Sequence, residues 1–142
     1  MKVTRQSIQN KQSWPGYHVP DYDAGAIAQA TKKQPQWLHF GPGNIFRIFP
    51  AVLCQRLIEA GRMSTGILCC ESYDEQVVTR CLQPNENLTV AVTMHADGSF
   101  DKEIVASIAD SLLLSRDEDE LQRIFEASSL QMVSFTITEK GY

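Results

Sequence analysis

The segment that decides the fold runs from Trp37 to Phe49 and reads W-L-H-F-G-P-G-N-I-F-R-I-F. Its apolar start breaks at Gly41-Pro42-Gly43 and resumes at helical spacing, which predicts a strand, a tight glycine turn and a helix start. Glycine permits the turn and lets a pyrophosphate approach, and the unpaired N–H groups of a helix start attract phosphate. Asn44 can add a side-chain hydrogen bond there. The dinucleotide fingerprint G-x-G-x-x-G has its third position occupied by Phe46, so an ordinary turn without a ligand is an open alternative.

The composition is that of an ordinary globular protein. The 142 residues suffice for one domain with a sizeable core, and 43% are hydrophobic and 21% charged. A net charge of -4 without a Lys/Arg cluster argues against nucleic acid as a partner. No apolar run approaches the ~20 residues of a membrane helix, and the polar N-terminus lacks the apolar region of a signal peptide. We therefore expect no membrane partner and a cytoplasmic location.

The cysteines and histidines lack the spacing of a metal site. No C-x-x-C, H-x-x-x-H or H-E-x-x-H pattern occurs. We expect no metal, and cysteines that are reduced and buried as small hydrophobic residues. The residues concerned are Cys54, Cys69, Cys70, Cys81, His18, His39 and His95.

Residues 1–35 are polar and interrupted by prolines, which predicts an N-terminal arm with one short helix over Ala24–Thr31, capped by Asp23. A βαβ unit follows. Leu38–Phe40 is its first strand, and apolar spacing predicts a single helix over Ile45–Ala60 with Pro50 in its first two turns. The continuous apolar run Gly66–Cys70 is typical of a parallel strand buried on both faces.

Glu71 ends this second strand. An acidic residue there accepts the hydroxyls of the adenosine ribose in dinucleotide-binding units and repels the extra phosphate of NADP. A solvated strand-end carboxylate is the alternative, and Asp74 competes for the ribose role.

The second half of the chain departs from a plain Rossmann plan. A short helix is expected over Asp74–Leu82. Alternation over Leu88–Met94, the turn signal Asp97-Gly98 and a returning strand over Phe100–Ile108 predict an antiparallel hairpin. A third apolar run lies within Asp110–Ser115.

An acidic run covers Asp117–Glu120. We interpret it as the first turn of a helix capped by Ser115, rather than as a cation site, because carboxylates suit the positive end of a helix. Met132–Ile137 is the last strand, and the polar segment Thr138–Tyr142 follows where α/β folds place ligand contacts.

Three motifs, in this order, carry a family resemblance: H-F-G-P-G-N-I-F-R-I-F, H-A-D-G-S-F and T-I-T-E-K-G-Y. They resemble the polyol-specific long-chain dehydrogenases of carbohydrate metabolism, which include mannitol dehydrogenase, fructuronate reductase (mannonate oxidoreductase) and mannitol-1-phosphate dehydrogenase. The likeness extends from about Val19 to Tyr142.

The resemblance implies an α/β, Rossmann-like, mostly parallel sheet with an inserted antiparallel hairpin over residues 36–142, the N-terminal part of an NAD-binding coenzyme domain. It also accounts for Phe46, because one branch of the family has a bulky residue there. It implies that Glu71 binds the ribose. The pyrophosphate turn would comprise Gly41, Gly43, Asn44, Ile45 and Arg47, and the residues toward the nicotinamide would be Thr138, Glu139 and Gly141.

The family's C-terminal helical domain carries a K-x-x-x-x-N-x-x-H motif whose lysine is the general base, and this sequence lacks that motif. Lys140 belongs to the E-K-G-Y segment and is not that lysine. The resemblance therefore implies a truncated chain without catalytic residues, inactive alone. Its full-length parent would transfer hydride between NAD and a sugar alcohol or a hexuronate/aldonate. A non-catalytic nucleotide-binding or interaction module on the same fold is the alternative, and self-association through the incomplete domain is expected.

Overall fold

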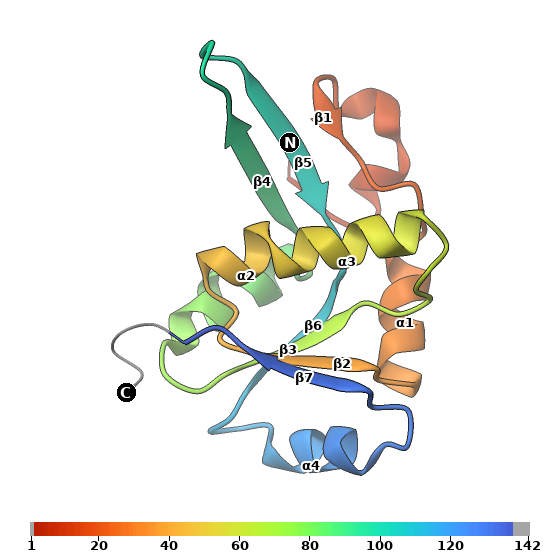
Figure 1. Cartoon of the computed structure of the whole chain (residues 1–142), viewed down its shortest axis with the longest axis vertical. Coiled ribbons are helices and arrows are strands. Elements are labelled where there is room, and N and C mark those ends of the chain that lie inside the picture. The colour runs from red at the N-terminus through yellow and green to blue at the C-terminus, as the bar shows by residue number, and fades with distance from the viewer. Residues whose placement is uncertain (1, 138–142) are drawn as a thin grey trace.

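The computed structural model describes residues 2–137 of the chain. Its largest sheet has four parallel strands in the order β6-β3-β2-β7, so the α/β class predicted from the sequence is confirmed (Figure 1). The strands are β2 (Trp37–Phe40), β3 (Ile67–Glu71), β6 (Ile108–Leu113) and β7 (Met132–Phe135). All five residues of β3 are buried, as expected for a strand covered on both faces.

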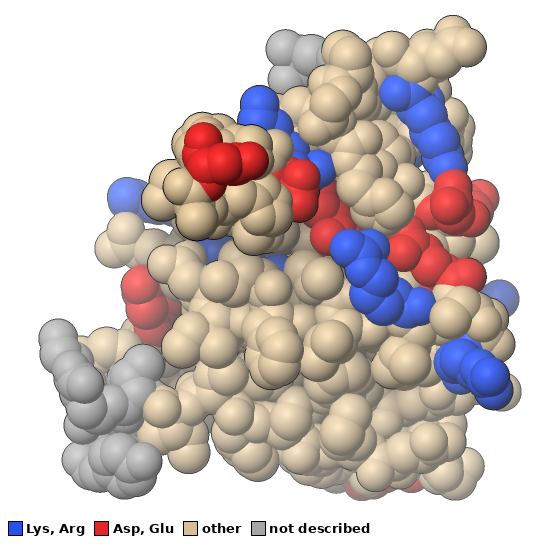
Figure 2. Space-filling model, turned by 45° about the horizontal axis from the view of Figure 1, so that its top comes forward, with Lys and Arg blue, Asp and Glu red and all other residues tan. Residues whose placement is uncertain are grey.

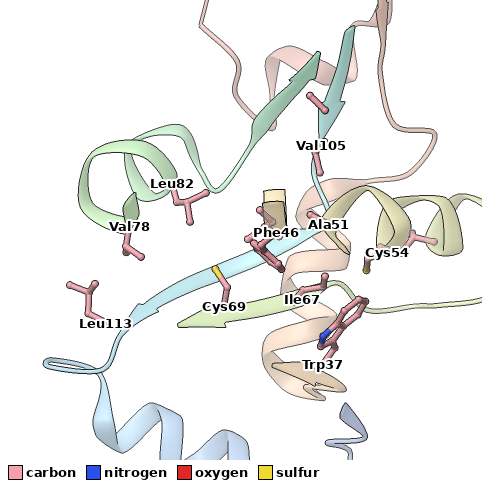
Figure 3. Close-up of a cluster of buried hydrophobic side chains, with 13 residues drawn as sticks. Trp37, Phe46, Ala51, Cys54, Ile67, Cys69, Val78, Leu82, Val105 and Leu113 are labelled. Atoms are coloured by element: carbon pink, nitrogen blue, oxygen red, sulfur yellow. The ribbon is translucent and has the colours of Figure 1, made fainter. Parts of the chain in front are cut away.

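Helices cover both faces of this parallel sheet. One layer consists of α2 (Asn44–Ile48), α3 (Pro50–Glu59) and a π-helical segment η3 (Val77–Leu82), which continues into η4 (Gln83–Asn85). The other layer consists of α1 (Ala24–Lys33) and α4 (Glu118–Glu126). Because side chains alternate along a strand, Trp37 packs in the first layer and Leu38 in the second. Figure 3 shows the first layer, with Phe46 at its centre near Ala51 and Cys69.

The predicted hairpin is present and forms β4 (Thr89–Met94) and β5 (Phe100–Val105), paired antiparallel. It belongs to a separate three-stranded sheet, since β1 (Tyr17–His18) pairs parallel with β5. Figure 1 shows this sheet above the parallel one. Two short 3-10 helices precede β1, namely η1 (Ser7–Gln9) and η2 (Lys11–Ser13). Ile8 and Trp14 of this N-terminal segment are buried against Leu88 and Ile104, so the segment packs at the base of the hairpin.

The single helix predicted over Ile45–Ala60 is wrong. The chain forms α2 and α3, with a break at Phe49, whose φ of -124° and ψ of -74° are not helical. Pro50 explains the break, because the proline ring disfavours helical geometry in the preceding residue. Pro50 is therefore the first residue of α3, where its missing N–H leaves no helical hydrogen bond unmade.

The crossing between the two sheets also differs from prediction. The strand expected over Phe100–Ile108 ends at Val105, and β6 begins at Ile108 in the other sheet. The two residues between β5 and β6 are hydrogen-bonded to α3. The Ala106 N–H donates to Gln55 Oε1 (2.8 Å), and the Ser107 hydroxyl donates to the Ala51 carbonyl (2.6 Å). These bonds hold the chain at the crossing between the sheets.

The caps of the two other predicted helices have different outcomes. Asp23 caps α1 as predicted, accepting from the N–H groups of Gly25 and Ala26. The acidic run does supply the first turn of α4, but the cap position is Asp117, and the Ser115 hydroxyl instead donates to Glu75. Within residues 2–137 no group of His, Cys, Asp and Glu is placed to hold a metal ion, and no helix is long and apolar enough to cross a membrane.

Candidate functional site

The glycine turn lies at the carboxyl end of β2, between the ends of β3 and β7. Gly41 has a φ of +86°, which favours glycine, and its N–H donates to the Cys70 carbonyl at 3.0 Å. A Cβ at this position would lie 2.7 Å from the Thr136 carbonyl oxygen. Packing against the chain that follows β7 therefore requires glycine at position 41.

Gly43 is different, because residues 2–137 give no structural reason for glycine there. Its φ of -68° and ψ of -170° are open to any residue, and a Cβ added at this position would meet no described atom within 4 Å beyond its chain neighbours. Its N–H donates to the Gly41 carbonyl at 2.8 Å. The space beside Gly43 is therefore open to a ligand that approaches the backbone closely.

The helix start beside Gly43 presents unpaired donors. Gly43 occupies the cap position of α2, and the N–H groups of Asn44, Ile45 and Phe46 have no acceptor among residues 2–137. The predicted side-chain cap by Asn44 is wrong, because Asn44 is the first helical residue and its Oδ1 accepts from Arg47 Nη2 at 2.5 Å. Arg47 Nε donates to the Gly43 carbonyl at 3.3 Å, so its guanidinium lies over the turn and adds positive charge there.

Phe46 explains how the turn works without the third glycine of the fingerprint. Its side chain is fully buried, and its ring stacks on that of His39 with centroids 4.1 Å apart and planes 11° apart. A third glycine would allow close contact between helix and strand. Here an aromatic pair fills the space between α2 and β2 instead.

Glu71 lies beside the turn, because β2 and β3 are in register and Phe40 pairs with Cys70. It is only 8% exposed, so it is not the solvated carboxylate considered as an alternative. Its Oε1 accepts from the N–H groups of Ser72 and Tyr73, both at 2.9 Å, and of Asp74 at 3.3 Å. Its Oε2 accepts no hydrogen bond from residues 2–137, so one oxygen organises the loop while the other has a free acceptor site.

Of the other predicted residues, Asp74 is exposed and accepts from the Gln76 N–H at 3.2 Å, which is a local turn contact. Thr138, Glu139 and Gly141 lie outside the described residues. The structure thus brings the glycine turn, Arg47 and Glu71 to one edge of the sheet.

Sequence reasoning missed a buried polar cluster behind the turn. His39 is 1% exposed, and burial lowers its pKa to about 4. Its ring contacts Ser134 and Thr136, and Ser134 also contacts Trp37. The available signal was weak: polar residues alternate at positions 134 and 136 in a strand otherwise rich in apolar residues.

No family model matches the chain. D-mannonate oxidoreductase of Thermotoga maritima is 41% identical over 147 aligned positions, which cover 100% of this chain and 27% of that protein. Two solved structures each match with a TM-score of 0.82 and cover 100% of this chain and 28% of theirs. They are D-sorbitol dehydrogenase in substrate-free form, at 21% identity, and Pseudomonas fluorescens mannitol 2-dehydrogenase in a ternary complex with NAD and D-mannitol, at 23%.

The fold is therefore that of the N-terminal part of a dehydrogenase coenzyme domain. The chain is homologous to D-mannonate oxidoreductase over the N-terminal portion of that protein. It spans little more than a quarter of the length of these relatives.

Proposed function

We propose that this chain binds NAD as part of an oxidoreductase that transfers hydride between the nicotinamide and a sugar alcohol or a hexuronate/aldonate, of the mannitol–fructose or mannonate–fructuronate type. The observation that carries the proposal is the backbone beside Gly43, which residues 2–137 leave open, next to Arg47 and to three N–H groups that have no acceptor among those residues. The 41% identity to D-mannonate oxidoreductase supports it, and so does the ternary complex of mannitol 2-dehydrogenase with NAD and D-mannitol.

Each residue has a definite part in this proposal. The N–H groups of Asn44 and Ile45 bind the pyrophosphate, whose charge the helix start and the Arg47 guanidinium stabilise. Gly41 shapes the turn and Gly43 lets the phosphates approach. Glu71 accepts a ribose hydroxyl at Oε2, the oxygen that the loop leaves free. A 2′-phosphate would meet this carboxylate, so NAD is preferred over NADP.

The remaining assignments follow the same plan. Residues 36–142 form the NAD-binding part and residues 1–35 an arm packed against it, and Thr138, Glu139 and Gly141 lie toward the nicotinamide. Bound NAD would supply the hydride chemistry at its nicotinamide ring. The sequence contains no K-x-x-x-x-N-x-x-H motif to take up the hydroxyl proton, so these residues alone turn over no mannitol, mannonate or fructuronate.

Thermal-shift titration of the chain with NAD and NADP tests the proposal. A ligand that binds only the folded chain at 100 times its Kd adds about 2.7 kcal/mol to the free energy of unfolding. NAD should raise Tm in a saturable way and more than NADP does. Equal or reversed shifts would contradict the ribose role of Glu71, and no shift with either dinucleotide would contradict the proposal as a whole.

A second candidate function is a non-catalytic interaction module, which an exposed apolar stripe favours. Five side chains on α2, α3 and the break between them are 41% to 62% exposed, and they recur at steps of one, three and four residues: Ile45, Ile48, Phe49, Leu53 and Leu57. Figure 2 shows a broad face of the molecule whose centre is free of charged residues. The outer edge of β7 also pairs with no strand within residues 2–137. Apolar patches and open strand edges promote association.

Sedimentation velocity tests whether the apolar stripe is an interface. We expect concentration-dependent self-association of the chain, reduced in Leu53→Glu, which places a charge in the stripe. Gln76→Glu adds the same charge at an exposed polar position and serves as the matched control. A monomer at high concentration, or equal effects of the two variants, would count against the apolar stripe as an interface.

A further inference from the structure

We infer that His39 is a positioning residue for the glycine turn: its neutral ring, with the proton on Nε2, joins a one-way chain of hydrogen bonds from the Trp37 indole to the Gly41 carbonyl. The inference concerns how the turn is held, and its link to cofactor binding rests on the proposed function.

The residues of this hydrogen-bond chain come from two neighbouring strands. His39 on β2 pairs in register with Ser134 on β7. Its Nδ1 lies 2.8 Å from Ser134 Oγ, and its Nε2 lies 3.1 Å from Thr136 Oγ1. Stacking on Phe46 holds the ring plane, since the two centroids are 4.1 Å apart. Both ring nitrogens of a nearly inaccessible imidazole are thus paired inside the protein.

The Trp37 end of the hydrogen-bond chain determines whether His39 Nδ1 carries a proton. Trp37 Nε1 can only donate, and it lies 2.7 Å from Ser134 Oγ, so Ser134 accepts there. The Ser134 hydroxyl has a single hydrogen, and His39 Nδ1 is the only acceptor within hydrogen-bond distance of it among residues 2–137, so the hydrogen is directed at Nδ1. Nδ1 therefore accepts and carries no proton.

The opposite end gives the same answer independently. The Gly41 carbonyl oxygen can only accept, and Thr136 Oγ1 lies 2.6 Å from it, so the single Thr136 hydrogen is used in that bond. Thr136 Oγ1 must then accept from His39 Nε2, which carries the proton. With the proton on Nδ1 instead, the Ser134 hydrogen would have no acceptor among residues 2–137, and no hydrogen would lie between His39 Nε2 and Thr136 Oγ1.

The hydrogen-bond chain ends on the Gly41 carbonyl oxygen, which shapes the turn. The Gly41 carbonyl also accepts the Gly43 N–H at 2.8 Å, so the oxygen that Thr136 holds in place orients the next peptide of the turn. The Thr136 N–H adds a bond to the Phe40 carbonyl at 3.0 Å, which fixes the strand end. The hydroxyl of Thr136 therefore transmits the position of the His39 ring to the backbone beside Gly43.

Nitrogen NMR of the ¹⁵N-labelled chain tests the tautomer without any ligand. The expected spectrum shows His39 with an unprotonated Nδ1 and a protonated Nε2 at neutral pH. Spectra of the His18→Gln and His95→Gln variants assign the signals of the three histidine rings. Both substituted side chains are partly exposed, so we expect these variants to fold. A protonated Nδ1 on His39 would overturn the inference.

Thr136→Val tests the coupling to the turn, because valine keeps the shape of threonine and removes the hydroxyl. We expect hydrogen exchange at the Gly43 amide to accelerate roughly tenfold, the effect of losing one buried hydrogen bond, and Thr136→Ser to restore the slow rate. Thr93→Val, at an exposed position of β4, is the control. Unchanged Gly43 exchange in Thr136→Val would overturn the positioning role.

Titration with NAD then tests whether the hydrogen-bond chain contributes to the proposed function. NAD affinity should fall by about tenfold in Thr136→Val and recover in Thr136→Ser. If the unmodified chain binds no NAD, the proposed function fails while the tautomer and exchange results still decide the role of His39. If NAD binds equally to Thr136→Val, the hydrogen-bond chain has no part in cofactor binding, and the link between His39 and the proposed function is overturned.

Discussion

Alanine substitutions at Gly41 and Gly43 should have opposite consequences, although the two residues lie in one turn. Gly41→Ala should destabilise the chain strongly. Gly43→Ala should leave folding intact and abolish dinucleotide binding. The structural difference is the surroundings of the added methyl group, which is crowded at position 41 and open at position 43.

The magnitude for Gly41→Ala has two parts. A φ of +86° costs an L-residue about 1–2 kcal/mol. The new Cβ would lie 2.7 Å from the Thr136 carbonyl oxygen, so the backbone after β7 must move, and such overpacking costs about 1–3 kcal/mol. The total of about 2–5 kcal/mol is a large share of the ~5–15 kcal/mol that stabilises a typical domain.

Urea unfolding, followed by circular dichroism, measures these costs. Gly61→Ala is the matched control for backbone strain, because Gly61 has a φ of +67° and no described atom within 4 Å of an added Cβ. The free energy of unfolding of Gly61→Ala should fall only by the cost of the positive φ, about 1–2 kcal/mol. Gly43→Ala should be neutral or gain up to about 1 kcal/mol, since alanine restricts the unfolded chain.

Two outcomes would refute this reasoning. If Gly41→Ala lost no more stability than Gly61→Ala, the contact with the Thr136 carbonyl would not constrain the turn. If Gly43→Ala bound NAD as tightly as the unmodified chain, the open space beside Gly43 would not be where the phosphates approach.

Three further predictions follow from burial. His39 has a pKa of about 4 in the folded chain against 6.5 as its ordinary value, so the unfolded chain binds more protons between these pH values. The free energy of unfolding should therefore fall by about 3 kcal/mol as pH drops from 6.5 to 4, and urea titrations of His39→Gln should lack this loss. Phe46→Ala should cost about 3–5 kcal/mol because the ring is fully buried, whereas Phe49→Ala, 60% exposed, should cost under about 1 kcal/mol in the same assay. A thiol reagent should label Cys81 alone in the native chain and all four cysteines in urea, because Cys81 is exposed and the others are buried with raised thiol pKa values: Cys54, Cys69 and Cys70. Labelling of a second cysteine in the native chain would contradict the buried positions.

The elements that could be predicted from the sequence are those whose causes are local. The glycine turn, the doubly buried strand β3 and the hairpin at Asp97-Gly98 follow from backbone freedom and from the period of apolar residues. These properties act within a few residues, so reading along the chain finds them. The break at Phe49 is also local, because Pro50 causes it, and helical spacing on both sides concealed it.

The residues that meet across the sheet are known only from the folded chain. Ser134 lies 95 positions from His39 and contacts it because β7 pairs with β2 rather than with its neighbours in sequence. Gln55 of α3 likewise lies 51 positions from Ala106, and its Oε1 accepts the Ala106 N–H immediately after the end of β5. Strand order and register set these contacts, and they depend on how the whole chain packs. The residue types at positions 39 and 134 therefore could not show by themselves that a buried histidine lies behind the glycine turn.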